Sequence, residues 1–369
     1  MTRLREALGD IAADAPMVNL ADLAIAGHRR RRMRTALAIT SVAALAVAGA
    51  TSVALVMPWH RLAADATPQN AVEVPELPEG KVGTVSHAYR TACTAGQAPR
   101  TIDCSPAEWR VVTAGGTTYR MPQALAFTAA HDRVPLALSR DGRKLAYYSD
   151  EAAVFVVRDL MTGREVTSPI KFRQEEIKAG AILVLSDDGR HLAFDPLIGK
   201  KRPTTLIDLR TGEAKRLNSR YEPISIKEGV VELVRYVKTD LWRMPVEGGG
   251  KPVRFKGAWI GFSELHQDGR TVVAIDHADY RKGAHTTFGV LDAETGRIVR
   301  KVRMTGVPAK TGIDGLSVWR SEKVVTVSTS VKSSRRLYAV DVTTGKATLL
   351  ADLGTKAREL VLPGGASGK

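Results

Sequence analysis

Apolar and polar residues alternate in short runs from about residue 84 onward, and one phrase of this pattern is repeated. It reads LALSRDGRKLAYYSD at residues 136–150 and LVLSDDGRHLAFD at residues 183–195, so that Asp141 and Asp188 are 47 positions apart. Each phrase has an Asp-Gly pair between two apolar runs. This is a strong signal for a β-hairpin, because glycine adopts positive φ at little cost. The pattern therefore predicts antiparallel strands.

Each hairpin is followed by two further apolar runs, which are joined by a Thr-Gly turn. The first unit continues VFVVRDLMTGREV and the second TTLIDLRTGEAKRL, so each unit has four predicted strands. Gly163 and Gly212 of these turns are 49 positions apart, and so are Gly296 and Gly345. The 84 positions between Gly212 and Gly296 leave room for one additional unit, which residues 230–255 fit.

The repeat continues at residues 263–302 and 316–350, and an earlier unit is indicated by TYRMP (118–122), which is similar to LWRMP (241–245). Six units of about 40–50 residues are typical of a β-propeller, in which radial packing buries both faces of every sheet. We therefore predict that residues 84–369 form an all-β, six-bladed β-propeller. Five or seven blades are the alternatives.

The C-terminal run RELVLPGG (358–365) is similar to the opening of a blade, but no further strand follows it. The first unit, in turn, has a poorly formed beginning. We therefore predict that residues 358–363 pair with the first blade, so that both ends of the chain share one sheet. Such closure removes two open strand edges that would otherwise invite aggregation.

A stretch of 23 residues without charge, TALAITSVAALAVAGATSVALVM (35–57), precedes the repeats. At about 1.5 Å per residue, a helix of this length spans roughly 34 Å, enough for the core of a bilayer. Five arginines lie directly before it in HRRRRMR, so the positive-inside rule places residues 1–34 in the cytoplasm and the repeats outside. We expect a single-pass membrane anchor. A secretory signal cleaved at LAADA (62–66) is the alternative.

Residues 1–34 contain two predicted amphipathic helices. Leu4, Leu8 and Ile11 share one helical stripe, and Asn19 is a good N-cap for the second helix. One interpretation is a surface helix that leads into the membrane. The other is a docking peptide for a cytosolic partner that binds a helix in a groove.

The segment between the apolar stretch and the repeats, residues 58–83, contains four prolines with alanines and acidic residues between them, which predicts an extended linker. The only two cysteines, Cys93 and Cys104, follow it. Outside the membrane, such a pair predicts a disulfide bond. A metal site is the alternative interpretation, but His87 is the only histidine near them.

The net charge of +15 is concentrated in the predicted propeller, where residues 84–369 hold 45 basic and 31 acidic side chains. A basic domain favours association with anionic partners. Because we expect the propeller outside the cytoplasm, we predict no nucleic acid as partner. Anionic polymers of the cell envelope or lipid headgroups are the partners that this charge favours, and a solvated basic surface is the simpler interpretation.

Few side chains suggest chemistry. Asp141, Asp188 and Asp268 are turn residues in our interpretation, since aspartate is favoured before glycine in turns. His277, Asp279 and His285 lie close together in DHADYRKGAH, which suggests either a metal site or a solvated loop, and we favour the loop. The sequence has no Gly-rich phosphate loop, nucleophile elbow or metallohydrolase helix motif. We expect no enzyme activity, no catalytic residue, no cofactor and no metal.

The phrase LALSRDGRKLAYYSD with VVRDLMTGREV resembles the repeats of the TolB and WD-repeat-like β-propellers of bacteria. The likeness covers roughly residues 84–365, and the chain as a whole resembles actinobacterial membrane-anchored proteins of this kind. The resemblance implies a non-enzymatic module that binds an extracytoplasmic ligand or protein.

Residues 1–34 also resemble the leaders of actinobacterial membrane proteins that are paired with extracytoplasmic-function sigma factors, although they are too short for a complete anti-sigma domain. The second hypothesis is therefore a transmembrane sensor. In it, the propeller is the receptor, and residues 1–34 dock a cytosolic partner such as a sigma factor.

Overall fold

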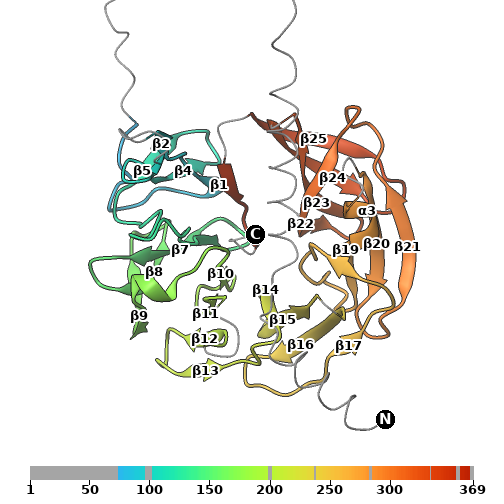
Figure 1. Ribbon diagram of the computed structural model, residues 1–369, viewed down its shortest axis with the longest axis horizontal. Coiled ribbons are helices and arrows are strands. Elements are labelled where there is room, and N and C mark those ends of the chain that lie inside the picture. Colours follow the sequence, from blue (N-terminus) through green and yellow to red (C-terminus); the bar gives the residue numbers. More distant parts are fainter. Residues whose placement is uncertain are drawn as a thin grey trace, which may run out of the picture. The chain divides into compact units, whose positions relative to one another are not determined.

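The computed structural model describes residues 74–95, 102–197, 202–236, 238–281, 285–332, 334–354 and 358–365. In these residues the chain forms six four-stranded sheets and one two-stranded hairpin, and the neighbouring strands of each sheet are antiparallel. The sheets are arranged as blades around one axis (Figure 1). The prediction of an all-β, six-bladed β-propeller is confirmed.

The blades are numbered along the chain, and the strands of each blade are given from the axis outward. Blade 1 contains β26 (Arg358–Val361), β1 (Val85–Arg90), β4 (Trp109–Thr113) and β5 (Thr118–Met121). Blade 2 contains β6 (Ala137–Leu138), β7 (Lys144–Ser149), β8 (Val154–Asp159) and β9 (Glu165–Lys171). Blade 3 contains β10 (Ile182–Leu185), β11 (His191–Asp195), β12 (Thr205–Asp208) and β13 (Ala214–Arg216).

The second half of the ring follows the same order. Blade 4 contains β14 (Glu222–Lys227), β15 (Val230–Arg235), β16 (Asp240–Pro245) and β17 (Val253–Arg254). Blade 5 contains β18 (Trp259–Ile260), β19 (Thr271–Asp276), β20 (Thr287–Asp292) and β21 (Ile298–Arg303). Blade 6 contains β22 (Gly312–Ser321), β23 (Val324–Val331), β24 (Ser334–Asp341) and β25 (Ala347–Gly354). Outside the blades lie the hairpin of β2 (Thr94–Ala95) and β3 (Ile102–Asp103), the 3₁₀ helix η1 (Gln174–Glu176) and α3 (His277–Tyr280).

The spacing of the glycines predicted an additional unit at residues 230–255. This segment contains three of the four strands of blade 4. The likeness of residues 118–122 to residues 241–245 does not reflect equivalent positions in the two blades. The first sequence lies mainly in β5, the outer strand of blade 1, whereas the second lies in β16, the third strand of blade 4. The likeness therefore located a blade but did not identify its strand.

The ring is closed by the C-terminal strand, as predicted. The innermost strand of blade 1 is β26, which pairs with β1, so the two ends of the propeller share one sheet. Ala88 lies opposite Val361, and Tyr89 lies opposite Leu360. Without β26, one edge of β1 would lack its partner, so closure protects an edge from pairing with other chains.

Aspartate side chains close both turns of the repeat. Asp141 and Asp188 each accept a hydrogen bond from a serine hydroxyl and from a backbone N–H two residues later, and the glycine after each has positive φ. In the second turn, an aspartate four residues before the glycine accepts hydrogen bonds from two backbone N–H groups. The aspartates of this second kind are Asp159, Asp208, Asp292 and Asp341. A Cβ atom at Gly296 would lie 2.0 Å from the carbonyl oxygen of Arg254 in blade 4, so this turn requires glycine.

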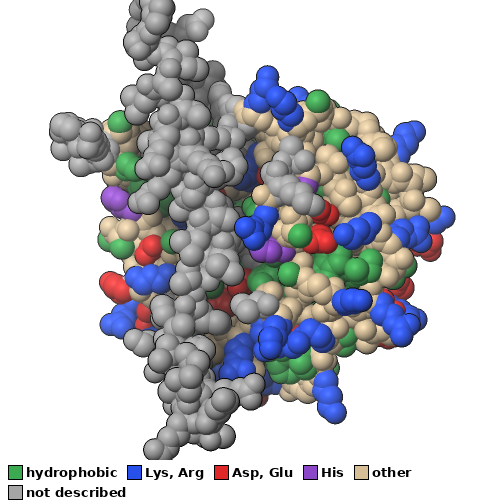
Figure 2. All heavy atoms as spheres, turned by 45° about the vertical axis from the view of Figure 1, so that its right-hand side comes forward, with side chains coloured by type: hydrophobic (Ala, Val, Ile, Leu, Met, Phe, Trp, Pro, Cys, Tyr) green, Lys and Arg blue, Asp and Glu red, His purple; other side chains and the backbone are tan. Residues whose placement is uncertain are grey.

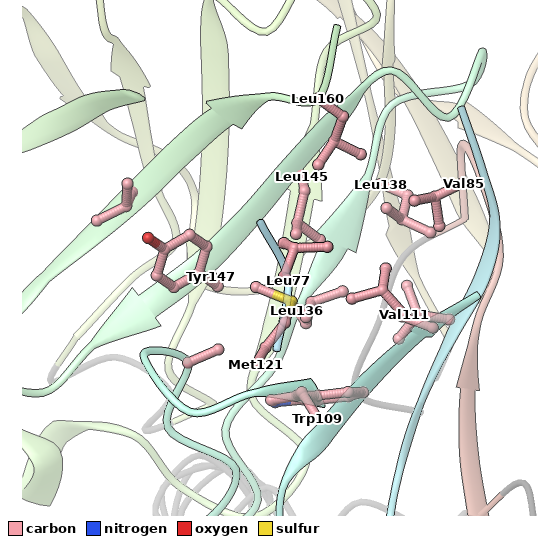
Figure 3. Packing of buried hydrophobic residues seen from close by; sticks show 14 of the residues in the cluster. Leu77, Val85, Trp109, Val111, Met121, Leu136, Leu138, Leu145, Tyr147 and Leu160 are labelled. Carbon is pink, nitrogen blue, oxygen red and sulfur yellow. The ribbon is translucent and has the colours of Figure 1, made fainter. Parts of the chain in front are cut away.

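The hydrophobic core is distributed between neighbouring blades. Each of five clusters joins two successive blades, from blades 1 and 2 to blades 5 and 6. Between blades 1 and 2, Trp109 and Val111 of β4 lie near Leu136 and Leu145, as Figure 3 shows. Because each blade buries apolar side chains against its neighbour, the stability of one blade depends on the others.

Residues 74–83, which we call the strap, pack on the propeller, although the sequence assigned them to the extended linker 58–83. Leu77 is only 6% exposed, and its N–H donates to the carbonyl of Arg120 in β5 (2.9 Å). The guanidinium of Arg158 donates to the carbonyls of Pro78 and Gly80. The compact unit therefore begins at Val74 rather than at residue 84. The prolines of this segment predicted an extended linker, but the apolar side chain of Leu77 anchors the strap on the propeller.

The other N-terminal predictions lie outside the described residues. These are the cytoplasmic segment 1–34, the membrane anchor 35–57 and residues 58–73 of the linker. Among the helices in the described part of the chain, none combines the length and the apolar character needed to cross a membrane.

Candidate functional site

Inner strands and the turns that follow them contribute a polar cluster at one end of the axis, which we call the axial network (Arg140, Asp187, Lys227, Glu232, Glu264 and Trp319). Its centre is the carboxylate of Glu264, which is 5% exposed. Glu264 Oε1 accepts hydrogen bonds from Arg140 Nε and from the backbone N–H of Trp319, both at 2.9 Å. Arg140 belongs to blade 2 and Glu264 to blade 5. Since these blades face each other in a ring of six, their contact crosses the axis.

Arg140 and Glu264 also connect the network to blades 6 and 3. Arg140 Nη2 donates to the carbonyl of Trp319 in blade 6 (2.5 Å), and the indole N–H of Trp319 donates back to the carbonyl of Glu264 (3.0 Å). The backbone N–H of Arg140 donates to Asp187 of blade 3 (3.2 Å). The C-terminal Gly364, just beyond β26, donates to the carbonyl of Leu138 (3.0 Å).

Blade 4 reaches the network through two side chains of its inner hairpin. Lys227 Nζ donates to the carbonyl of Leu265 (3.2 Å), and Glu232 Oε2 accepts from the N–H of the same residue (2.9 Å). Ser225 also donates to Glu232 Oε2. Glu232 is 1% exposed, and among the described residues its Oε1 has no hydrogen-bond partner. All six blades therefore contribute backbone or side-chain groups to this end of the axis.

Burial in the axial network disfavours negative charge. It raises the pKa values of Asp187 and Glu264, although Arg140 lies beside both. It raises the pKa of Glu232 to about 7, against the opposing effect of the hydrogen bond from Ser225. Desolvation of a carboxylate favours its neutral form unless hydrogen bonds or cations compensate. Glu232 therefore titrates near neutral pH.

A second ionic cluster, built around the buried Arg90, lies where the two ends of the propeller meet in blade 1, and we call it the clasp (Arg90, Trp109, Phe127, Arg133 and Glu359). Arg90 is 2% exposed, pairs with the carboxylate of Glu359 and donates to the carbonyl of Ala126 (2.9 Å). Its guanidinium lies 4.2 Å from the centroid of Phe127 and 5.4 Å from that of Trp109. Arg133 reaches the other oxygen of Glu359 at 2.5 Å.

The clasp requires an irregularity in β26. Tyr89 is opposite Leu360, whereas Arg90 is opposite Arg358, so Glu359 is an extra residue in the pairing. Its φ of 54° is positive, as at a β-bulge. Burial, together with the nearby charge of Arg133, lowers the pKa of Arg90 to about 9. The bulge thus brings a carboxylate to a cation that would otherwise be buried alone.

The structure separates the residues that the sequence suggested for chemistry. Asp141, Asp188 and Asp268 all accept hydrogen bonds within their own turns, which supports their interpretation as turn residues. His277 and Asp279 lie in α3, between β19 and β20, and His285 follows a gap in the described chain. Within the described ranges, no group of three or more His, Cys, Asp or Glu side chains is arranged to hold a metal ion.

Cys93 and Cys104 form a disulfide bond in the structure. The bond joins the two sides of the short hairpin of β2 and β3, which interrupts blade 1 between β1 and β4. The thiols are thus used within this hairpin rather than for a ligand.

The basic side chains of the propeller are dispersed. Figure 2 shows Lys and Arg side chains over the face formed by the blades at the right of Figure 1, without a single dense patch. Many arginines also pair with carboxylates, as Arg190 does with Asp208 and Arg270 with Asp292. This face therefore resembles the solvated basic surface considered above.

Comparisons with known proteins identify similar folds but no family. No protein-family model matches the chain, and no curated protein matches it. Among solved structures, the chain is similar to TolB from Acinetobacter baumannii, at 17% identity over 77% of this chain and 67% of that one, with a TM-score of 0.49.

Two further structures show the breadth of the similarity. One is a nidogen/laminin complex (10% identity, 75% of this chain, 96% of that chain, TM-score 0.43). The other is the dihydro-heme d1 dehydrogenase NirN (16%, 76%, 57%, TM-score 0.38). These values are too low to carry function, so the β-propeller fold rests on the sheet topology described above.

Proposed function

We propose that this protein is a single-pass, membrane-anchored β-propeller that acts outside the cytoplasm as a non-enzymatic module for binding a protein partner. The observation that carries the proposal is that the ring is held together at two places. The clasp links its first and last strands in blade 1, and the axial network links the blades at one end of the axis. A fastened ring is a rigid frame, and binding residues in proteins commonly lie on loops that such a frame positions. Residues 35–57 and the arginines before them support the anchor.

The binding function can be tested by covalent cross-linking of the full-length protein in membranes, with partners identified by mass spectrometry. We expect a specific extracytoplasmic protein to be recovered and to bind the purified protein in detergent. A variant that ends at Thr355 lacks β26 and serves as a control with an open ring. Partners that the open ring recovers equally well would contradict a role for the folded propeller.

The anchor has a separate test. We expect the intact protein to remain in the membrane fraction after alkaline extraction, at its full length. Recovery of a soluble form that begins near Ala66 would contradict the anchor and favour a cleaved signal.

The strap favours a second candidate function, that of a transmembrane sensor. Residues 74–83 are bound to blades 1 and 2, so the described chain is fixed to the ring from its first residues onward. In this hypothesis residues 1–34 dock a cytosolic partner such as an extracytoplasmic-function sigma factor. Capture of such a factor by residues 1–34 as bait, lost when Leu4, Leu8 and Ile11 are replaced by Ser, would favour the sensor.

A further inference from the structure

A pocket of about 470 Å³ lies between the outer parts of blades 2 and 3. This volume is within the range of about 300–1,000 Å³ that is typical of ligand sites. Ile170 and Phe172 line it from the end of blade 2, and Ala214 and Arg216 line it from β13. β9 and β13 are the outermost strands of their blades, so the pocket lies near the circumference of the ring.

The apolar floor of the pocket is held in place. Phe172 is 6% exposed, and its ring centroid lies 5.5 Å from that of Phe155 and 4.9 Å from that of Phe194. The Tyr148 hydroxyl donates to the carbonyl of Phe172 (2.6 Å), and the N–H of Phe172 donates to the carbonyl of Ala153 (2.9 Å). The floor is therefore formed before any ligand binds, which lowers the entropic cost of binding.

The rim of the pocket has excess positive charge. The carboxylate of Glu176 is already engaged, by Arg202 and by Arg173 Nε at 3.5 Å. Arg216, an exposed residue of β13, has no carboxylate partner among the described residues. Arginine binds a carboxylate through paired N–H groups, so an anionic group would complement this rim.

We propose that this pocket binds an extended segment of a protein partner, in which an apolar or proline side chain lies beside an acidic residue. The proposal rests on the proposed function. The apolar side chain would pack on Ile170 and Phe172, next to Pro196 and Pro203, which also line the pocket. The acidic side chain would pair with Arg216 at the rim. Because the pocket opens between two exposed outer strands, a chain segment can enter it from the circumference of the ring.

The test is selection of random linear dodecapeptides, displayed on phage, against the full-length protein in detergent. We expect the selected peptides to combine Asp or Glu with Pro, Leu or Ile. Arg216→Glu should weaken their binding at least about tenfold, because a charge-assisted hydrogen bond is replaced by repulsion. Ala214→Trp should weaken it too, by filling the pocket.

Arg210→Glu is the matched control, since it makes the same charge change in the same blade, at a turn outside the pocket. Melting temperatures of all three variants show whether each one is folded, and Arg216→Gln gives a milder change at the same site. The proposal is overturned if no acidic peptide is selected, or if folded Arg216→Glu binds the selected peptides like the wild type. If Arg216→Glu still binds the cross-linked partner of the propeller normally, this site is wrong while the binding function stands.

Discussion

The clasp and the axial network both bury ionisable side chains, but they link different parts of the ring. The group that the clasp buries is basic, whereas those that the axial network buries are acidic. The clasp joins the two ends of the propeller within blade 1 and buries a cation, Arg90, against two aromatic rings. The axial network joins blades that are already complete and buries carboxylates, Glu232 and Glu264. The clasp decides whether the ring is closed, whereas the network fixes how the closed blades meet. Breaking either one should therefore have different consequences.

The largest effect is expected when the chain ends at Thr355, which removes β26. The melting temperature of the whole propeller should fall and aggregation should increase, because β1 loses its inner partner and blade 1 opens. A chain that ends at Gly365 keeps β26 and is the control. If the chain that ends at Thr355 melts like this control, the stability of the propeller does not depend on β26 or on the clasp.

Glu359→Gln removes the charge partner of Arg90 and leaves β26 in place. We expect a loss of about 3–5 kcal/mol in the free energy of unfolding in urea, because a buried cation is left without its carboxylate. Arg133→Gln is the matched control on the other oxygen of Glu359. The Arg133 side chain is 53% exposed, so its loss should cost less than about 1 kcal/mol. Equal effects of the two substitutions would show that burial of Arg90 does not matter.

The disulfide tests how much of blade 1 depends on a covalent bond rather than on the clasp. Replacing Cys93 and Cys104 together by Ser should lower the free energy of unfolding by roughly 2–3 kcal/mol, by the chain-entropy argument for a short loop. The wild-type protein under reducing conditions is the comparison. Mass spectrometry after non-reducing isolation should find the two residues bonded, and two free thiols would contradict the prediction.

The smallest effect is expected in the axial network and depends on pH. The pKa of Glu232 is about 7 in the folded protein, against an ordinary value of 4.5, so the folded state holds this proton more tightly than the unfolded state. Its contribution to stability is therefore present at low pH and is lost as the pH rises from about 4.5 to about 7.

Glu232→Gln removes this titration and keeps an oxygen for the Ser225 hydroxyl and the Leu265 N–H. Relative to the wild type, the variant should gain on the order of 1–3 kcal/mol between pH 5 and pH 8 in urea unfolding. Glu228→Gln, an exposed residue of the same hairpin, should leave the pH dependence unchanged. Parallel curves for wild type and Glu232→Gln would refute a buried, titrating carboxylate.

Local sequence patterns predicted the blades well, because the signals that define them are local. An Asp-Gly or Thr-Gly pair forces a turn through the backbone of glycine, and the apolar runs on each side can only be strands that pack. The closing strand was predictable for the same reason, as residues 358–363 repeat an opening that other blades show in full. The aspartate of the second turn, for example Asp208, also recurs four residues before the glycine in the sequence. Its role as the acceptor that closes the turn became clear only from the hydrogen bonds of the structure.

The two buried clusters could not be predicted, because their partners are distant in sequence. Arg140 and Glu264 are 124 positions apart. Arg140 even occupies a place in the repeated phrase where the next unit has Asp187, so its side chain looks like a variable surface residue. Glu359 contacts Arg90 only because a bulge turns it inward, and nothing in RELVLPGG marks a bulge. Such contacts follow from the closed topology rather than from local composition.

The position of β26 also has a consequence for the time course of synthesis. The strand that completes blade 1 follows β1 by about 270 residues, so a ribosome makes β1 first and its inner partner much later. At about 5–20 residues per second, roughly 15–55 seconds pass between them. Throughout that interval β1 offers an unpaired edge to every neighbouring nascent chain. Because faster elongation shortens this interval, the edge of β1 is exposed longest when translation is slow, and the demand on chaperones that cover it should be greatest then.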